Sequence, residues 1–431
     1  MGVSPVMRAA AWPIRFWALL CLCGLPGMLI AQTPSVRSPA LALSGGLWFD
    51  GEGFARADWY AVDGRLTRTR PARIDATLDL SGRYVLPPLV EAHNHDLQNA
   101  RFAAVSIGKN LRQGVFHSVQ MCSRNRADGD FAALLNTPGT IDVIYADACI
   151  SASDGHPLGM VLASAREAGM TETPESARRY YDPVDTLADL DRLWPEIAAR
   201  RPTLIKIILV NSERQAANRA DPATFGYRGL DPALVAPIVT RAHEAGIRVA
   251  AHVDSAADFA TAVAAGVDII AHLPGYRFAT GLGAADYRID EAPIAEAARR
   301  GTIVVTTTGV AQFWTRRATP EVVAAVRATQ IDNLRRLRAA GVMLAIGSDN
   351  VMGTVVDEIL YLDALRIMPR AELLRRATID TAEAMFPGRE IGAFREGGEA
   401  SLIAFDVNPL EFPEALRTPV LRVRRGSLLS Q

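Results

Sequence analysis

Short apolar runs alternate with amphipathic segments along most of the chain, from about residue 84 to residue 350. The runs predict eight β-strands, over residues 84–92, 115–121, 141–148, 203–209, 247–253, 267–273, 302–308 and 342–348. Helical patterns lie between most of these strands. Asp231-Pro232 marks the start of one helix as an N-cap followed by proline, and Gly246 marks its end.

Eight parallel strands, each followed by a helix, are the strand count of a (β/α)8 barrel. The sequence therefore predicts an α/β protein with a TIM barrel over residues 87–387. A doubly wound open sheet has a similar pattern, and strand count alone does not exclude it. Residues 42–83 and 391–427 instead contain short strands around turns, and neither is long enough for a core of its own. We expect one small β-sandwich domain built from residues 32–86 and 388–431.

Residues 1–31 have the layout of a secretory signal peptide. Arg8 and Arg15 precede the apolar run Phe16–Ile30, and Ala31-Gln32 is a suitable cleavage point. A membrane anchor is the alternative, but the run is shorter than the ~20 residues needed to span a bilayer, and it contains glycine and proline. We expect an exported protein, periplasmic or secreted, whose mature chain has no membrane span.

Composition bears on partners and on cysteine chemistry. The 431 residues carry a net charge of −1 without long charged runs, so nothing indicates binding to nucleic acid. We expect a small-molecule substrate, and the sequence leaves open whether the chain forms a homo-oligomer. Two cysteines, Cys122 and Cys149, lie outside the predicted signal peptide. We expect them as free thiols packed like small apolar side chains. A disulfide is the alternative, because the two cysteines follow adjacent predicted strands and export permits oxidation.

Lysine is rare in this chain. Only two lysines, Lys109 and Lys206, occur among its 46 basic residues. Lys206 lies within the apolar run 203–209, which predicts a strand buried on both faces. A lone buried ammonium costs several kcal/mol unless its charge is compensated. The chain uses arginine at nearly every other basic position and keeps an amine at this costly one, which indicates amine chemistry that a guanidinium cannot perform.

Six residues that can bind a metal ion fall in or just after the predicted strands: His93, His95, Lys206, His252, His272 and Asp349. The two histidines of the first strand are two residues apart, so their side chains point to the same side. In a closed barrel the eighth strand pairs with the first, which brings Asp349 beside them, and strands four to six gather the other three. The carboxyl ends of barrel strands form the catalytic face. Four imidazoles and a carboxylate suit Zn²⁺, with Mn²⁺, Co²⁺, Ni²⁺ and Fe²⁺ as alternatives.

Five motifs carry a family resemblance: residues 86–95 (LPPLVEAHNH), 204–207 (LIKI), 249–252 (VAAH), 266–272 (GVDIIAH) and 345–349 (AIGSD). With these motifs the chain resembles the amidohydrolase superfamily of metal-dependent hydrolases over most of its length. Within that superfamily it resembles the binuclear branch that contains Xaa-Pro dipeptidases and imidazolonepropionase-like enzymes. Pro88 stands where the family usually has glycine, and this and other departures mean that a substrate is not carried over from any relative.

The resemblance implies cofactors and roles. Lys206 would be carboxylated by CO₂ to a carbamate that bridges two divalent ions, with Zn²⁺ expected. The two histidines of the first strand and Asp349 would hold one ion, and His252 and His272 the other. The protein would be an exported binuclear hydrolase that cleaves an amide or cyclic amide C–N bond, in a dipeptide, an N-acyl amino acid or a lactam-like molecule, by a metal-bridging hydroxide. Asp349 would take the proton of the hydroxide and pass it to the leaving nitrogen.

Two other functions stay open. A mononuclear metal-dependent deaminase on the same fold needs no bridging lysine and usually carries glutamate three residues after the strand-five histidine, where this chain has Ser255. A non-catalytic relative typically loses metal ligands, and none of the six is missing here. Metal content separates the three functions: two ions per chain favour hydrolysis, one favours deamination, and none favours a binding module.

Further candidate residues lie in loops at the expected catalytic face. His156, after the third strand, is either a catalytic and substrate-contacting residue or a structural one. Tyr227 and Arg228 follow the fourth strand, and Tyr276 and Arg277 follow the sixth. Such pairs are candidates to clamp a substrate carboxylate, because arginine binds carboxylates with two parallel hydrogen bonds. The alternative for each arginine is a solvated loop side chain.

Overall fold

The structure of the chain is a computed structural model that describes residues 39–98, 100–122 and 133–429. The predicted signal peptide lies outside these residues and stays a prediction. Within the described residues, no helix combines the length and the apolar composition that a membrane crossing requires.

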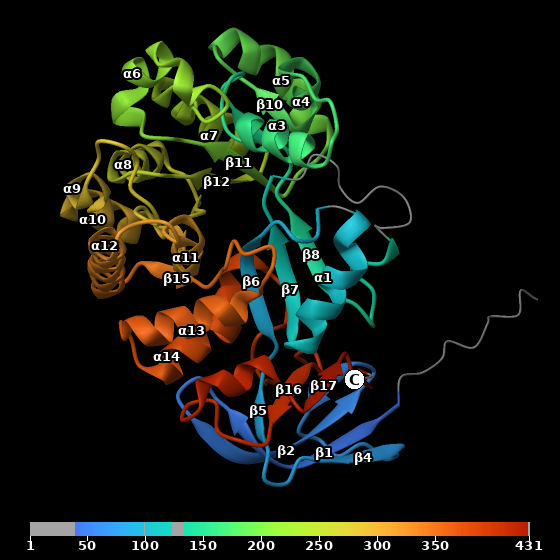
Figure 1. Cartoon of the computed structure of the whole chain (residues 1–431). Coiled ribbons are helices and arrows are strands. Elements are labelled where there is room, and N and C mark those ends of the chain that lie inside the picture. Colours follow the sequence, from blue (N-terminus) through green and yellow to red (C-terminus); the bar gives the residue numbers. More distant parts are fainter. Residues whose placement is uncertain (1–38, 99, 123–132, 430–431) are drawn as a thin grey trace, which may run out of the picture. The chain divides into compact units, whose positions relative to one another are not determined.

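The two ends of the described chain contribute to one mixed sheet of eight strands. These strands are β1 (Leu41–Phe49), β2 (Phe54–Val62), β3 (Arg65–Thr67), β4 (Ala76–Asp79), β5 (Tyr84–Leu86), β16 (Leu402–Phe405), β17 (Leu421–Arg424) and β18 (Ser427–Leu428). Their order is β18-β17-β16-β5-β1-β2-β3, and β4 pairs with β1. The N-terminal strand β5 therefore lies between β1 and the C-terminal strand β16, with Val85 opposite Ala404 (Figure 1). Trp48, Trp59 and Val423 belong to a separate apolar core on this sheet.

The strands between these ends all pair in parallel and form two further sheets. The first sheet has the order β6-β7-β8, with β6 (Leu89–Asn94), β7 (Val115–Gln120) and β8 (Asp142–Tyr145). The second has the order β10-β9-β11-β12-β13-β14-β15, with β9 (Cys149–Ser151), β10 (Tyr181–Pro183), β11 (Leu204–Ile208), β12 (Arg248–His252), β13 (Ile269–Ile270), β14 (Ile303–Val305) and β15 (Met343–Ala345). This order confirms the α/β class and the consecutive placement of the predicted strands.

The predicted single closed ring of eight strands is only partly present. The expected third strand is interrupted, so that β8 pairs with β7 and β9 pairs with β11. Between the two sheets, isolated backbone hydrogen bonds replace strand ladders, such as those from the Ala92 amide to the carbonyl of Ile346 and from the Asp147 amide to the carbonyl of Leu204, each 3.0 Å long. The chain leaves extended geometry at Asp349, whose φ is 49°, and this ends the ladder that β15 could otherwise form with β6.

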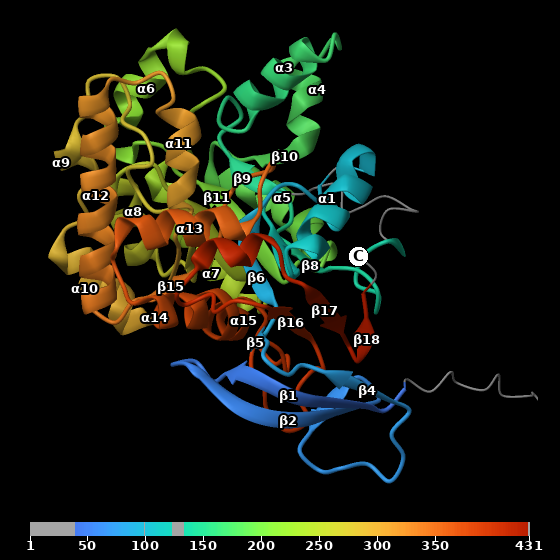
Figure 2. The same cartoon turned by 60° about the horizontal axis from the view of Figure 1, so that its bottom comes forward.

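Helices follow most of these strands and lie on their outer side in both views (Figures 1 and 2). The longer helices are α1 (Ala100–Arg112), α3 (Leu158–Glu167), α5 (Leu187–Ala199), α7 (Val235–Glu244), α8 (Ala256–Ala265), α10 (Glu291–Arg300), α12 (Pro320–Ala339) and α13 (Val355–Leu365). The shorter ones are α4 (Pro174–Ala177), α6 (Gln215–Ala220), α9 (Ala284–Tyr287), α11 (Ala311–Trp314), α14 (Arg370–Arg375) and α15 (Thr381–Met385). Ile238 of α7 and Phe259 of α8 join Ile205 and Val249 of the strands in the main apolar core.

Local signals fix the helix that follows β12. Ser255 is the N-cap of α8: its side chain accepts a hydrogen bond from the Asp258 amide, and Asp258 accepts one from the Ser255 amide. Gly266 ends the helix with φ of 86°, a conformation that costs glycine little. The predicted start at Asp231-Pro232 is correct for a 3₁₀ turn, and α7 itself begins at Val235. A rigidly capped α8 holds the loop that leaves His252.

The cysteine prediction is wrong. Cys122 and Cys149 form a disulfide, with their Cα atoms 4.8 Å apart. Cys122 lies just past β7 with φ of 63°, and Cys149 opens β9, where it is the register partner of Lys206. The interruption between β8 and β9, which the sequence did not reveal, brings the two side chains together. The bridge therefore joins the end of β7 to the strand beside Lys206.

Candidate metal centre

Three of the predicted ligands form a compact group at the ends of β6 and β15. Nε2 of His93 lies 3.2 Å from Nε2 of His95. The same two nitrogen atoms lie 3.7 and 3.5 Å from Oδ1 of Asp349. The Asp349 amide donates to the carbonyl of His93 at 2.8 Å, which fixes the carboxylate beside the two imidazoles. These three residues can hold one metal ion, since one ligand atom of each lies within 4.8 Å of the others.

The other three predicted ligands lie against this group. Nζ of Lys206, on β11, is 3.5 Å from Nε2 of His93. Nδ1 of His272 is 3.6 Å from Oδ2 of Asp349. The ring of His252 lies 4.6 Å from the ring of His272, centroid to centroid. The structure thus brings all six sequence-predicted residues together, from β6, β11, β12 and the segments that follow β13 and β15.

Hydrogen bonds orient three of the imidazoles. Nδ1 of His93 bonds the carbonyl of Ala271 at 2.8 Å, and Nδ1 of His95 lies 2.9 Å from Nε2 of Gln98. His252 is held in the opposite sense, with its Nε2 3.1 Å from Oδ1 of Asp254. Its buried Nδ1 has no hydrogen-bond partner among the described residues. An orphaned imidazole nitrogen beside five other donor groups fits a divalent metal ion.

Burial sets the protonation of the group. Lys206 is only 1% exposed, and burial lowers the pKa of its amine. Burial and the neighbouring Lys206 also lower the pKa of His95 to about 3. Burial raises the pKa of Asp349, against the opposing effect of Lys206. Neutral imidazoles and a readily deprotonated amine are the forms that bind metal ions and react with CO₂.

Two acidic residues support the centre and were missed by the sequence analysis. Glu91 is fully buried and accepts hydrogen bonds from the amides of His93 and Ser348 at 3.1 and 2.8 Å, which joins β6 to the segment after β15. Burial raises the pKa of Glu91 to about 8. Asp254 accepts from His252 and from the hydroxyl of Tyr276. In the sequence, each lies two residues from a predicted histidine ligand, and this spacing was the available signal.

His156 lies at the same centre. Its ring stacks on the ring of His252, with 5.0 Å between centroids and 23° between planes. Its amide donates to the carbonyl of Arg228 at 2.8 Å, which ties the loop after β9 to the loop after β11. Burial, followed by the neighbouring His252 and Lys206, lowers the pKa of His156. A neutral imidazole here can contact a substrate bound at the centre.

The pair Tyr276 and Arg277 also borders the centre. The Tyr276 ring lies 6.0 Å from the ring of His272, and its hydroxyl donates to Asp254. Nη2 of Arg277 lies 3.5 Å from Oδ2 of Asp254. The Arg277 guanidinium lies 4.5 Å from the centroid of the Trp314 ring. This partly exposed arginine is thus placed between an aromatic side chain and the buried carboxylate.

Arg228 does not face the centre as a free donor. Its Nε donates to Oγ1 of Thr224 at 2.9 Å, Nη1 donates to Asp154, and Nη2 donates to the carbonyl of Asp221 at 2.9 Å. These contacts make Arg228 a structural residue of its loop and argue against the predicted clamp. Tyr227 is exposed and its ring packs closely on Gly159.

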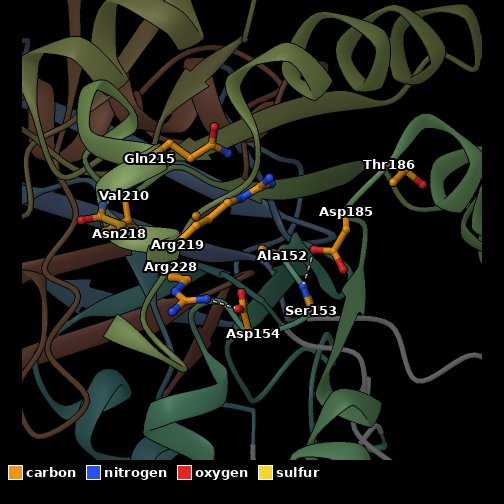
Figure 3. A pocket seen from close by; sticks show the side chains of 11 residues that line it. Ala152, Ser153, Asp154, Asp185, Thr186, Val210, Gln215, Asn218, Arg219 and Arg228 are labelled. Carbon is orange, nitrogen blue, oxygen red and sulfur yellow. Dashed lines mark hydrogen bonds and ion pairs between the residues drawn. The ribbon is translucent and has the colours of Figure 1, made fainter. Parts of the chain in front are cut away.

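Arg228 and Asp154 also line a pocket of about 370 Å³ that contains none of the six predicted ligands. Figure 3 shows this pocket, with the Arg228–Asp154 ion pair on one wall and the hydrogen bond from Ser153 to Asp185 on another. Gln215 and Arg219 extend over it from the opposite side. The pocket therefore lies beside the loop that carries His156 and is separate from the metal centre.

A second cluster of metal-binding residue types lies where β7 and β8 begin. Nε2 of His117 is 3.7 Å from Asp142 and 3.9 Å from Glu399. Arg424 and Arg425 bind Asp142 at 2.6 and 2.8 Å, and Arg389 binds it as well. These arginines neutralise the carboxylates that a cation would need, so we interpret this cluster as an ionic contact between the barrel strands and the terminal sheet.

The chain is similar to known proteins over most of its length. The sequence profile described as "Amidohydrolase family" matches residues 161–427, more than half of the chain. An imidazolonepropionase of Chromobacterium violaceum is 25% identical over 395 residues, which cover 86% of this chain and 87% of that protein. Among solved structures, a Xaa-Pro dipeptidase with bound methionine has a TM-score of 0.69 at 17% identity and covers 91% of this chain and 100% of its own. The A. niger ochratoxinase has a TM-score of 0.69 at 18% identity and covers 91% and 96%. The predicted resemblance is confirmed, and the chain belongs to the amidohydrolase family.

Proposed function

We propose that this protein is an exported, binuclear metal-dependent hydrolase that cleaves an amide or cyclic amide C–N bond of a small molecule. The observation that carries the proposal is the contact of Nζ of Lys206 with Nε2 of His93, 3.5 Å apart, inside a ring of three further ligand side chains and Asp349. An isolated buried amine at that position has no structural benefit, whereas a carbamate between two cations does.

We also infer that the parallel strands form a (β/α)8 barrel and the terminal strands a small β-sandwich domain. The backbone hydrogen bonds from Ala92 to Ile346 and from Asp147 to Leu204 support a ring that closes at both edges of the two sheets. The solved relatives share the fold at TM-scores of 0.69. In a barrel the predicted ligands other than Lys206 lie at or just after the carboxyl ends of the strands, where such enzymes carry their active sites, and Lys206 lies within β11.

The donor set fits two divalent ions, with Zn²⁺ expected. His93, His95 and Asp349 would hold one ion, His252 and His272 the other, and carboxylated Lys206 would bridge them. When bound, such ions lower the pKa of a water molecule and polarise the carbonyl of the scissile bond. The lowered pKa of Lys206 favours the carbamate, because only the unprotonated amine can form a bond to the carbon of CO₂.

Asp349 is the residue placed to move a proton. The water oxygen adds to the carbonyl carbon, its proton passes to the Asp349 carboxylate, and the same proton reaches the nitrogen as the C–N bond breaks. Burial raises the pKa of Asp349 toward neutrality, which suits a group that must both accept and release a proton. The products are a carboxylic acid and an amine, and the remaining proton of the acid passes to solvent or to the amine, which leaves a carboxylate.

Arg277 and His156 support a carboxylate-bearing substrate. Arg277 is the partly exposed cation that borders the centre, and His156 stacks on His252. The relatives include a protein named as a Xaa-Pro dipeptidase and one named as an imidazolonepropionase. We therefore infer a dipeptide, an N-acyl amino acid or a lactam-like molecule as substrate.

The deaminase alternative has less support. Ser255, at the position where deaminases carry glutamate, caps α8 and donates its hydroxyl to Glu213 at 2.8 Å. Ser255 thus has a structural role, and this position provides no carboxylic acid to the centre.

A hydrolysis screen tests the proposal. Purified protein is loaded with Zn²⁺ in bicarbonate, its metal content is measured, and panels of dipeptides, N-acyl amino acids and lactams are assayed for new amine and carboxylate groups. Two ions per chain with turnover on one panel are expected. One ion per chain with release of ammonia from an exocyclic amine would favour deamination, and absence of bound metal would favour a non-catalytic relative.

A further inference from the structure

Asp254 is a buried carboxylate that the proposed chemistry leaves without a role. It lies two residues after His252, at the mouth of β12, and only 6% of it is exposed. Its amide donates to Oδ2 of Asp258 at 3.0 Å, and Asp258 also accepts from the amides of Asn211 and Ser255. The backbone at Asp254 is thus anchored to the capped start of α8, and this fixes where its side chain points.

Both oxygen atoms of Asp254 are engaged. Oδ1 accepts from Nε2 of His252 at 3.1 Å and also from the hydroxyl of Tyr276. Oδ2 lies 3.5 Å from Nη2 of Arg277. The carboxylate therefore connects a predicted metal ligand on β12 with the two side chains that follow β13.

The bond to Asp254 decides which nitrogen of His252 carries a proton. An ionised carboxylate can only accept, so Nε2 of His252 is the donor and Nδ1 keeps its lone pair. Nδ1 is buried and has no partner among the described residues. The His252 ring lies 4.6 Å from the His272 ring, so this buried imidazole stands beside another predicted ligand.

We propose that Asp254 is a positioning residue for metal binding: it holds His252 in the tautomer and rotamer that present Nδ1 to a metal ion. Through Tyr276 and Arg277 the same carboxylate fixes the wall of the mouth relative to that ligand. The inference rests on the proposed binuclear site and gives Asp254 a role in it. Carboxylates that accept from a metal-binding histidine typically change metal affinity by about 10- to 100-fold when they are removed.

The test measures Zn²⁺ affinity directly, by competition with a chromophoric chelator in bicarbonate buffer. Asp254→Ala is expected to raise the higher of the two Zn²⁺ dissociation constants by about 10- to 100-fold. Asp254→Asn keeps the size and one accepting oxygen but loses the charge, so an intermediate loss is expected. The d–d spectrum of the Co²⁺-loaded protein should change in both variants, because the His252 ligand becomes mobile.

Three controls separate positioning from folding. Tyr276→Phe removes one donor to Asp254 and leaves the His252 bond, so its Zn²⁺ affinity should stay within threefold of the wild type. Asp191→Asn removes one exposed negative charge that pairs with Arg241 and should behave in the same way. In a His252→Ala background, Asp254→Ala should cause no further loss, because the ligand that it orients is gone.

Two results would overturn the inference. If the wild type binds two Zn²⁺ ions and both Asp254 variants bind them within threefold of its affinity, the positioning role is wrong and the proposed hydrolase site stands. If Asp254→Ala weakens binding equally with and without His252, Asp254 acts through the fold and not through this ligand. A wild type that binds fewer than two ions overturns the proposed binuclear site itself.

Discussion

Lys206 and His93 meet at 3.5 Å, Nζ to Nε2, although they belong to β11 and β6 in two different sheets. This contact joins the group of ligands on one side of the parallel strands to the group on the other side. A bridging ligand for two ions must lie at such a junction. This position suits the proposed carbamate, which an arginine could not form.

Replacement of Lys206 should therefore abolish metal binding at the bridge. Lys206→Ala and Lys206→Arg are each expected to lose at least one of two ions and nearly all turnover, measured by metal analysis and by hydrolysis assay. Formate or acetate should partly restore Lys206→Ala, because a small carboxylate can occupy the vacated position. Lys109→Arg is the matched control, since Lys109 is the other lysine and pairs with the buried carboxylate of Asp96, which is not one of the predicted ligands. A Lys206→Arg enzyme with two ions and full activity contradicts the mechanism.

The two arginines after β11 and β13 should respond differently to substitution. Arg277→Ala is expected to raise KM for carboxylate substrates by about tenfold or more, in line with the loss of a charge-assisted hydrogen bond, and to change KM for the corresponding amides little. Arg228→Ala should instead lower the unfolding temperature, because Arg228 bonds two groups of its own loop and Asp154 of the loop after β9. Steady-state kinetics and thermal unfolding of both variants check this. Equal KM changes on acids and amides would rule out the Arg277 clamp.

The disulfide predicts the thiol content of the mature protein. A denatured, unreduced sample should show no free thiol from Cys122 or Cys149, and two after reduction. Loss of the bridge in a Cys122→Ser, Cys149→Ser variant should reduce the free energy of unfolding by about 3–4 kcal/mol, the value expected for a loop of this length. Urea unfolding measures the difference. Two titratable thiols before reduction would contradict the bridge.

Stability should rise with pH through the range where His117 is neutral in the fold and charged in the unfolded chain. Burial lowers the pKa of His117 from 6.5 to about 4, against the pull of Glu399 and Asp142. Between these pH values the unfolded chain binds more protons, so the free energy of unfolding decreases as the pH falls from 6.5 to 4, by at most about 1.4 kcal/mol per pH unit. Urea unfolding at a series of pH values gives the free energy of unfolding as a function of pH, and this dependence should be steeper in the wild type than in His117→Gln. The same pH dependence of the free energy of unfolding in both proteins would contradict a lowered pKa for His117.

The mature N-terminus is expected near Gln32. N-terminal sequencing of protein recovered from the periplasm or the medium measures it. A chain that keeps residues 16–30 and sediments with membranes would instead indicate an anchor.

The sequence indicated which six side chains would come together, because five of them lie at or just past the end of an apolar run and Lys206 lies within one. Parallel strand order then places these runs side by side. It did not reveal Asp254 or Glu91, because a carboxylate two residues from a histidine becomes informative only when its partners on other strands are known. The contacts that argue against the Arg228 clamp were hidden for a related reason: Asp154, which binds Arg228, lies far away in the sequence. The break between β8 and β9, and with it the disulfide, depends on pairing choices that an apolar run does not encode.

The pairing of β5 with β16 makes this fold depend on the last part of the chain to be synthesised. β5 ends at Leu86 and β16 begins at Leu402, so a growing chain holds β5 with one open edge until the C-terminal strands leave the ribosome. Pairings at such sequence separation form slowly, and an open edge can template aggregation. A product truncated before residue 402 would also lack Arg424 and Arg425, and Asp142 would lose two of its ion-pair partners. Incomplete copies of this protein should therefore be short-lived in the cell.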